Sequence, residues 1–117
     1  MSMMSVRECT RRYNEMSKTY EAKAEPNRVN CYQCDKCGSI TKTIDVDDGV
    51  TPFYYQCEHC KNPVARSTMY YDIAPNQKPT QEWYRPTLKE VLKLRKNPSM
   101  LEYILNGGLD VRPIIQE

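Results

Sequence analysis

Four cysteines form two close pairs that could share one metal ion. Cys34 and Cys37 make the first pair, Cys57 and Cys60 make the second, and 19 residues separate the two pairs. This spacing is typical of four-cysteine zinc sites. Four thiolates at about 2.3 Å complete a tetrahedral shell, which is the structural form of zinc. The sequence therefore predicts one structural Zn²⁺ held by all four residues.

The first pair has an alternative register, because Cys31 also stands three residues before Cys34. We favour Cys34 with Cys37, since only Cys37 is followed by a glycine (Gly38) that can relieve the tight turn of a metal-binding loop. Cys9 is expected to be a small buried apolar residue.

Two other chemistries compete with zinc. Iron of the rubredoxin type uses similar cysteine pairs, and the spacing does not separate it from zinc. Six cysteines could also form three disulfides. The N-terminus lacks the apolar stretch of a secretory signal, so we expect a reducing cytoplasm, where paired cysteines bind metals more often than they form disulfides.

The cysteine-containing segments Cys34–Gly38 and Cys57–Cys60, joined by the predicted hairpin Ser39–Gln56, resemble the zinc-ribbon superfamily. The second segment departs from that pattern, since Lys61 and Asn62 follow Cys60 instead of glycine. We expect Asn62 to adopt the left-handed conformation there.

Three further segments are similar to short uncharacterised phage and prophage proteins: Thr51–Phe53, Trp83–Pro86 and Asn106–Leu109. This looser resemblance implies no activity. It implies a location in a host cytoplasm or a virion, and it allows a structural or adaptor role.

Strands are expected around the cysteines. Residues 39–46 alternate β-branched and polar side chains, residues 50–56 form a second strand after the Asp47-Asp48-Gly49 turn, and residues 64–72 form a third. The fold class is therefore predicted to be α+β, with a small antiparallel three-stranded zinc ribbon over residues 29–73.

Helical segments flank this ribbon on both sides. Residues 5–24 are predicted to form a helical arm within region 1–28, because Ser5 and Glu8 make a capping box. Region 74–117 is predicted to contain an extended connector over 74–86 and a C-terminal helical pair. Thr87 and Asn97 are the expected caps of these two helices, and Gly107-Gly108 ends the second.

Composition limits the core. Only 20 of 117 residues are Ile, Leu, Val or Phe, whereas 11 are aromatic. The net charge of +2 is too small to favour disorder. We therefore expect aromatic side chains and a bound metal to replace part of the missing aliphatic core.

A basic face could bind nucleic acid. Arg85, Lys89, Lys93 and Lys96 recur along one side of the C-terminal segment, and they could contact the phosphates of DNA or RNA. A solvated surface opposite the apolar stripe explains the same pattern. The pairs Tyr54-Tyr55 and Tyr70-Tyr71 should each place one ring outside, where it could stack on a base.

No catalytic group is predicted. His59 is the only histidine and is expected to be exposed, so no Cys–His nucleophile pair is available and we expect no enzyme and no small-molecule substrate. No segment is long and apolar enough to span a membrane.

The stripe of helix 5–24 needs a partner. Val6, Cys9, Tyr13, Met16 and Tyr20 alternate at spacings of three and four residues. They are predicted to dock on a second copy or on another protein, and folding back onto the strands of the same chain is the alternative.

Overall fold

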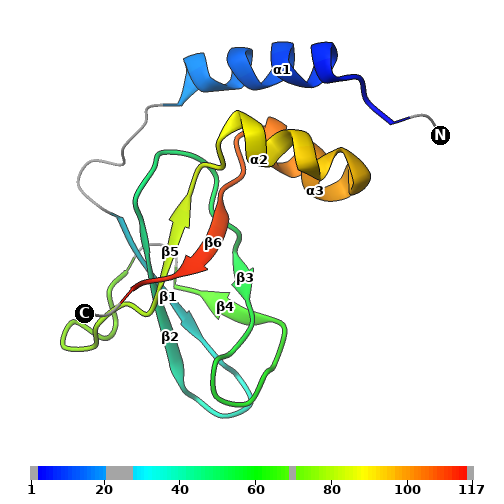
Figure 1. Cartoon of the computed structure of the whole chain (residues 1–117). Helices are drawn as coiled ribbons and strands as arrows, with labels where there is room; N and C mark the ends of the chain where they lie inside the picture. Colours follow the sequence, from blue (N-terminus) through cyan, green and yellow to red (C-terminus); the bar gives the residue numbers. More distant parts are fainter. Residues whose placement is uncertain (1–2, 21–27, 69–70, 116–117) are drawn as a thin grey trace.

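The computed structural model describes residues 3–20, 28–68 and 71–115. Three α-helices lie together at one end of the molecule, and a curled sheet extends away from them (Figure 1). The α+β class is therefore confirmed. The predicted three-stranded ribbon is wrong in detail, because the sheet has six strands in the order β3-β4-β1-β2-β5-β6.

Helix α1 spans Val6–Thr19 and begins as predicted, with the Ser5 hydroxyl accepting from the backbone N–H of Glu8 at 3.1 Å. It ends earlier than predicted, because Tyr20 is extended. Residues 21–24 of the predicted helix lie outside the described residues. Part of the apolar stripe packs on the C-terminal helices of the same chain: Cys9 is fully buried in their core, and Tyr13 packs against it. The Tyr13 hydroxyl also donates to the Pro86 carbonyl at 2.8 Å, whereas Val6 stays 48% exposed. Docking of α1 on a second copy of the chain or on another protein stays a prediction.

The C-terminal helices carry the predicted caps. Helix α2 (Leu88–Lys93) begins with a complete capping box between Thr87 and Glu90, and a 3₁₀ turn, η1 (Leu94–Lys96), continues it. Helix α3 (Pro98–Leu105) follows, and the Asn97 side chain accepts from the N–H of Met100. Gly107 has a positive φ of 100°, which ends α3 at low steric cost.

The strands are β1 (Arg28–Gln33), β2 (Ile40–Asp45), β3 (Tyr54–Tyr55), β4 (Ala65–Ser67), β5 (Gln81–Tyr84) and β6 (Asp110–Pro113). The predicted hairpin between residues 39–46 and 50–56 is wrong. Strand β2 pairs antiparallel with β1 and parallel with β5, whereas β3 pairs with β4. The sheet thus includes part of the predicted connector and crosses the boundary placed at residue 73.

The residues after β2 explain why the expected hairpin does not form. Gly49 is not among the positive-φ residues, so it does not make the predicted turn. It allows a close approach instead, because a Cβ there would lie 2.6 Å from the Gly107 carbonyl. Val50 then forms a bridge with Gly108. The chain therefore crosses to the helical end before it returns as β3.

Two clusters of buried residues hold the molecule together. The sheet core contains Tyr32, Cys34, Cys57, Ala65, Trp83 and Leu109. The helical core contains Cys9, Val91, Leu101, Ile104 and Leu105. In the sheet core the Tyr55 ring lies 5.5 Å from the rings of Tyr32 and Trp83. Aromatic rings therefore supply the sheet core, as the composition predicted.

Candidate metal centre

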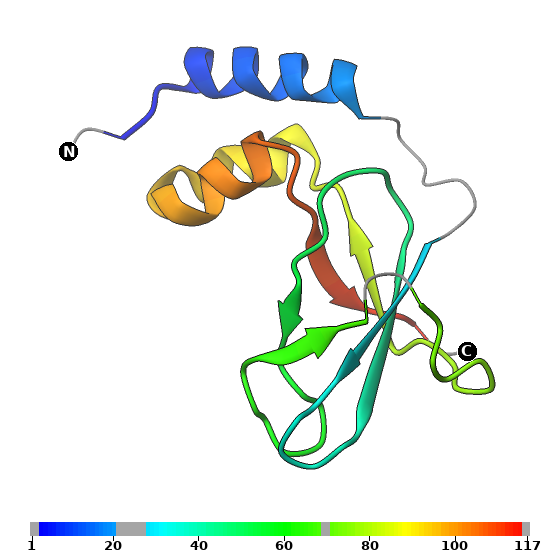
Figure 2. The same cartoon turned by 180° about the vertical axis from the view of Figure 1, so that it is seen from behind.

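Two loops at the end of the sheet away from the helices carry the paired cysteines (Figures 1 and 2). One loop joins β1 to β2 and the other joins β3 to β4. In the first loop the N–H of Cys34 donates to the Ser39 carbonyl at 2.9 Å, and in the second the N–H of Cys57 donates to the Asn62 carbonyl at 2.8 Å. The two loops therefore have the same backbone design.

The residue after each second cysteine is left-handed. Gly38 has φ 75°, as its identity predicted, and Lys61 has φ 65°. The expectation that Asn62 would adopt this conformation is wrong, because the turn needs it one residue earlier. A left-handed residue with a Cβ costs about 1–2 kcal/mol, so the second loop stores strain that the first avoids.

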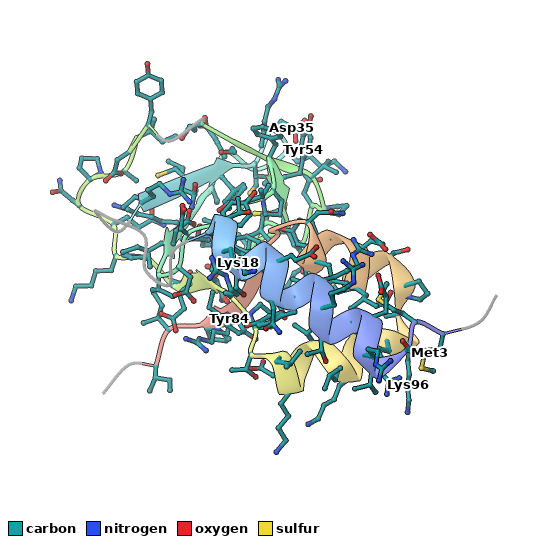
Figure 3. All side chains as sticks on the ribbon, turned by 90° about the horizontal axis from the view of Figure 1, so that it is seen from above. Met3, Lys18, Asp35, Tyr54, Tyr84 and Lys96 are labelled. Carbon is teal, nitrogen blue, oxygen red and sulfur yellow. The ribbon has the colours of Figure 1, made fainter. Side chains whose placement is uncertain are left out.

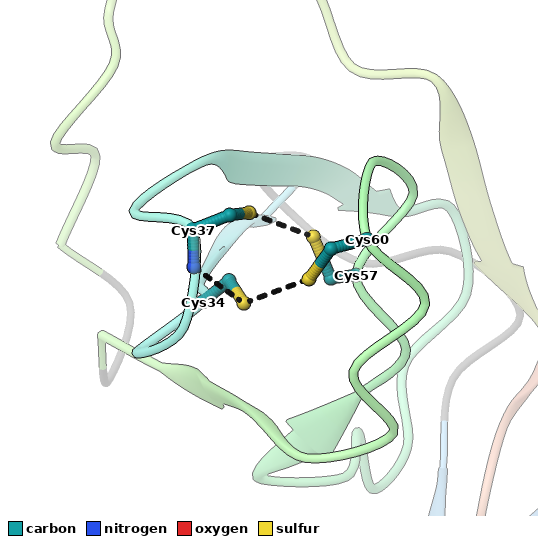
Figure 4. Close-up of side chains that lie close together, drawn as sticks. All are labelled: Cys34, Cys37, Cys57 and Cys60. Carbon is teal, nitrogen blue, oxygen red and sulfur yellow. Dashed lines mark hydrogen bonds between the residues drawn. The ribbon is translucent and has the colours of Figure 1, made fainter.

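The four sulfurs converge on one point (Figure 4). The Sγ atoms of Cys34, Cys37, Cys57 and Cys60 all lie within 4.8 Å of one another, close enough to hold a metal ion. The Cys34–Cys60 and Cys37–Cys57 sulfur distances are 3.4 and 3.6 Å. Bonds of about 2.3 Å to a tetrahedral metal give sulfur separations of about 3.8 Å, whereas a disulfide needs about 2.05 Å. The cluster therefore has the dimensions of a metal site and not of a disulfide.

Hydrogen-bond donors surround the Cys34 sulfur. The side-chain amide of Asn62 and the backbone N–H groups of Lys36 and Cys37 each lie 3.4 Å from it. The Asn62 amide, followed by the Cys37 N–H, lowers the pKa of Cys34 to about 6. The hydroxyl and the N–H of Ser39 likewise lower the pKa of Cys37. Hydrogen bonds to both sulfurs of the first pair therefore favour their thiolate forms.

The protein groups alone do not favour four thiolates. The Asn62 N–H lowers the pKa of Cys60, but the neighbouring Cys34 sulfur, burial and the other thiols outweigh it and raise this pKa to about 12. A divalent cation would supply the missing positive charge, because metal binding releases thiol protons. The donor set therefore fits a thiolate-preferring metal such as zinc or iron.

Asn62 is a site residue that the sequence did not reveal in this role. Its side chain is buried, donates to Cys34 Sγ and also donates to the Asp35 carboxylate at 2.9 Å. It thereby links the second loop to the first. The only signal in the sequence is its position two residues after Cys60.

The remaining cysteines and the histidine lie outside the cluster. Cys31 is fully buried in β1, and its thiol donates to the Asp72 carboxylate at 3.6 Å. The preferred register of Cys34 with Cys37 is therefore the one the geometry supports. Cys9 belongs to the helical core, as expected. His59 is exposed between Cys57 and Cys60 and is not part of the cluster.

The predicted basic residues are only partly brought together. Lys89, Lys93 and Lys96 line one hollow of about 380 Å³ with Met3, Leu92 and Arg95. Arg85 does not line this hollow, because its guanidinium donates to the Asp48 carbonyl at 2.7 Å and lies over the Tyr20 ring. Figure 3 shows Lys96 beside Met3 at the start of α1, away from Tyr54 and Asp35.

The first tyrosine pair divides as predicted. Tyr54 is 52% exposed, whereas Tyr55 lies in contact with Tyr32 and Trp83. In the second pair Tyr71 is exposed, and Tyr70 lies outside the described residues.

No protein-family model, curated protein or solved structure matches the chain. The resemblances to zinc ribbons and to phage proteins therefore stay predictions. Among the described residues, no helix has the length and apolar character needed to cross a membrane.

Proposed function

We propose that this protein is a zinc-stabilised module that binds nucleic acid through the basic face of α2 and η1. Zinc, held by Cys34, Cys37, Cys57 and Cys60, would supply structural cross-linking and no chemistry, because four thiolates leave no position for water. The metal end would thus maintain the shape of the sheet, and the helical end would make the contact.

The observation that carries the proposal is the charge of the hollow on α2 and η1. Lys89, Lys93 and Lys96 stand at spacings of four and three residues, which places them on one helical face. All three are exposed, and within residues 3–20, 28–68 and 71–115 no carboxylate forms an ion pair with them. Three unpaired cations beside one hollow are suited to a phosphate backbone.

Arg95 adds a fixed positive charge beside these lysines. Its side chain donates to the carbonyls of Leu92 and Met4, at 3.1 and 3.4 Å. It therefore links the segment before α1 to η1. These hydrogen bonds also hold its positive charge in a fixed position. A preorganised cation loses less conformational entropy on binding than a free lysine does.

Salt dependence tests the proposal. Binding of single- and double-stranded DNA and RNA oligonucleotides is measured by fluorescence anisotropy at several salt concentrations. Replacing Lys89, Lys93 and Lys96 by Ala should weaken binding and reduce the slope of log affinity against log salt by about 2 to 3, since each lost contact removes about 0.7–0.9.

The matched control replaces Lys18 and Lys78, two exposed lysines outside the hollow. Their replacement by Ala should leave the slope nearly unchanged. The proposal would be refuted if the protein bound no oligonucleotide at low salt. It would also be refuted if each control lysine changed the slope as much as each lysine of the hollow does.

A second candidate is an adaptor that binds another protein. A neighbouring hollow of about 380 Å³ is lined by Met3, Met4, Pro98 and Leu101, together with Arg95, Lys96 and Glu102. Apolar lining of this kind suits a side chain of a protein partner better than it suits a base. This candidate predicts that the exposed Met3 side chain, and not the lysines, controls binding, and that binding depends weakly on salt.

A further inference from the structure

A second exposed surface lies on the β3–β4 edge of the sheet. Phe53 and Tyr54 are 60% and 52% exposed, and both line a hollow of about 420 Å³ with Arg66 and Ser67. A group of exposed apolar side chains says more about binding than a single exposed one does. These two rings stay outside while Tyr55, the next residue, enters the sheet core.

Strand pairing fixes the geometry of this surface. Tyr54 is the register partner of Arg66, and Tyr55 is the partner of Ala65. Partners across an antiparallel pair share one face, with Cβ atoms about 4.5–5.5 Å apart. Tyr54 and Arg66 therefore stand side by side on the outer face. The Phe53 carbonyl accepts from the Ser67 N–H at 2.7 Å and holds Phe53 on the same edge.

Arg66 lies between surroundings of different charge. Arg66 is exposed, and no described acidic side chain forms an ion pair with it. Arg66 also lines a second hollow, together with Cys34 and Asp35. That hollow would be negative if four thiolates held a divalent metal. A phosphate is therefore expected in the hollow that Arg66 shares with the two rings.

We propose that Phe53, Tyr54 and Arg66 form a stacking platform for single-stranded nucleic acid, with bases on the rings and a phosphate on Arg66. This inference rests on the proposed function and narrows it to single strands. Bases in a duplex are already stacked, whereas unpaired bases offer their faces to aromatic rings. The β3 edge has only two residues, too few for a partner strand to gain much by pairing there.

The lysine face (Lys89, Lys93 and Lys96) and this platform are expected to contribute differently to binding. Figure 3 shows Tyr54 and Lys96 on different parts of the molecule. The lysines give salt-dependent attraction to any phosphate chain, and the rings add a contribution that depends on unpaired bases. A strand long enough to reach both surfaces should bind more tightly than one that reaches either alone.

The test compares oligothymidylate of about 4 to 16 nucleotides, the range of small single-strand sites, with a duplex of equal length and with inorganic polyphosphate. Phe53→Leu and Tyr54→Leu keep the apolar bulk but remove the aromatic face. Each should weaken binding of the single strand by about 5- to 150-fold without changing the salt slope. Arg66→Gln should reduce the slope by about 0.7.

Tyr71→Leu is the matched control, because Tyr71 is exposed and does not line the hollow. One metal equivalent per chain and unchanged fluorescence of the buried Trp83 would show that each variant is folded. Normal single-strand affinity in the ring variants, with loss in the lysine variant, would overturn the platform and leave the proposed function intact. Failure of the wild-type protein to bind any oligonucleotide would overturn both. Ring variants that change only self-association would show a protein interface instead.

Discussion

The end of this protein that carries the cysteine cluster and its helical end have different cores. The helical core consists of Cys9 and four aliphatic residues, which are Val91, Leu101, Ile104 and Leu105. Near the cysteine loops the buried cluster is made mostly of aromatic residues and thiols, and Ala65 and Leu109 are its two aliphatic members. A chain with few aliphatic side chains can concentrate them in one core if a metal cross-links the other end. Each end should therefore fail under a different perturbation.

Loss of the metal should have the largest effect. Cys57→Ser removes one ligand and should reduce bound metal well below one equivalent per chain, because metal-binding free energies of about 10–16 kcal/mol stabilise comparable small domains. Elemental analysis and near-ultraviolet circular dichroism measure the two consequences. The matched control is Cys31→Ser, which changes a buried cysteine outside the cluster and should retain one equivalent of zinc. Equal metal loss in both variants would contradict the assigned ligands.

A cavity in the helical core should have the next largest effect. Leu101→Ala should lower the free energy of unfolding by about 2–5 kcal/mol, measured by urea denaturation in the presence of zinc. The metal content of the folded variant should stay at one equivalent, because Leu101 belongs to the helical core and the cysteine loops lie at the far end of the sheet. Metal loss from the folded variant would show that the two ends are not independent.

Removing the amide that links the two loops should have a moderate effect. Asn62→Leu deletes the donor to the Cys34 sulfur and to the Asp35 carboxylate. Residues that hydrogen-bond to metal ligands typically change metal affinity by 10- to 100-fold, and competition with a chromogenic chelator can measure this change. His59→Leu is the control, since His59 is exposed and outside the cluster. Equal metal affinities in the two variants would show that Asn62 does not contribute to the metal site.

The smallest effect concerns an ion pair that joins α1 to α3. The Arg12 guanidinium donates to the Glu102 carboxylate at 2.6 Å and lowers the pKa of Glu102. Half of the Glu102 side chain is exposed, so Glu102→Gln should cost less than about 1 kcal/mol.

The pH dependence of the Arg12–Glu102 ion pair follows from the lowered pKa of Glu102. The stabilisation is present above the unfolded pKa, near 4.5, and disappears as pH falls through the lower folded pKa. The difference between Glu102→Gln and wild type in urea denaturation should therefore vanish in acid. A difference that grew on acidification would contradict this pairing.

Local features of the chain could be predicted because neighbouring residues decide them. Ser5, Thr87 and Asn97 cap helices through hydrogen bonds that span only three residues. Gly38 was identified because a turn after a metal-binding cysteine needs positive φ. The cysteine cluster was predicted from its spacing, since two short loops can meet at one metal wherever the strands between them run.

Strand pairing was predicted poorly, because it depends on contacts between distant segments. Strand β5 lies in a segment with three prolines, which suggested a connector, but Pro75, Pro79 and Pro86 all fall outside Gln81–Tyr84. Its parallel pairing with β2 spans almost 40 residues, and no local pattern encodes such a partner. The turn at Asp47–Gly49 suggested a hairpin, yet Gly49 serves a close contact with Gly107 instead.

The sequence alone therefore determined the helix caps, the preferred cysteine register and the aromatic character of the core, because each depends on residue type and short spacing. The tertiary structure decided the six-strand order, the link from Asn62 to Cys34, the packing of α1 on α2 and α3, and the separation of Arg85 from the lysine face. These features depend on which surfaces remain available once the distant segments have met, and this is settled by burial and by hydrogen bonding over the whole chain.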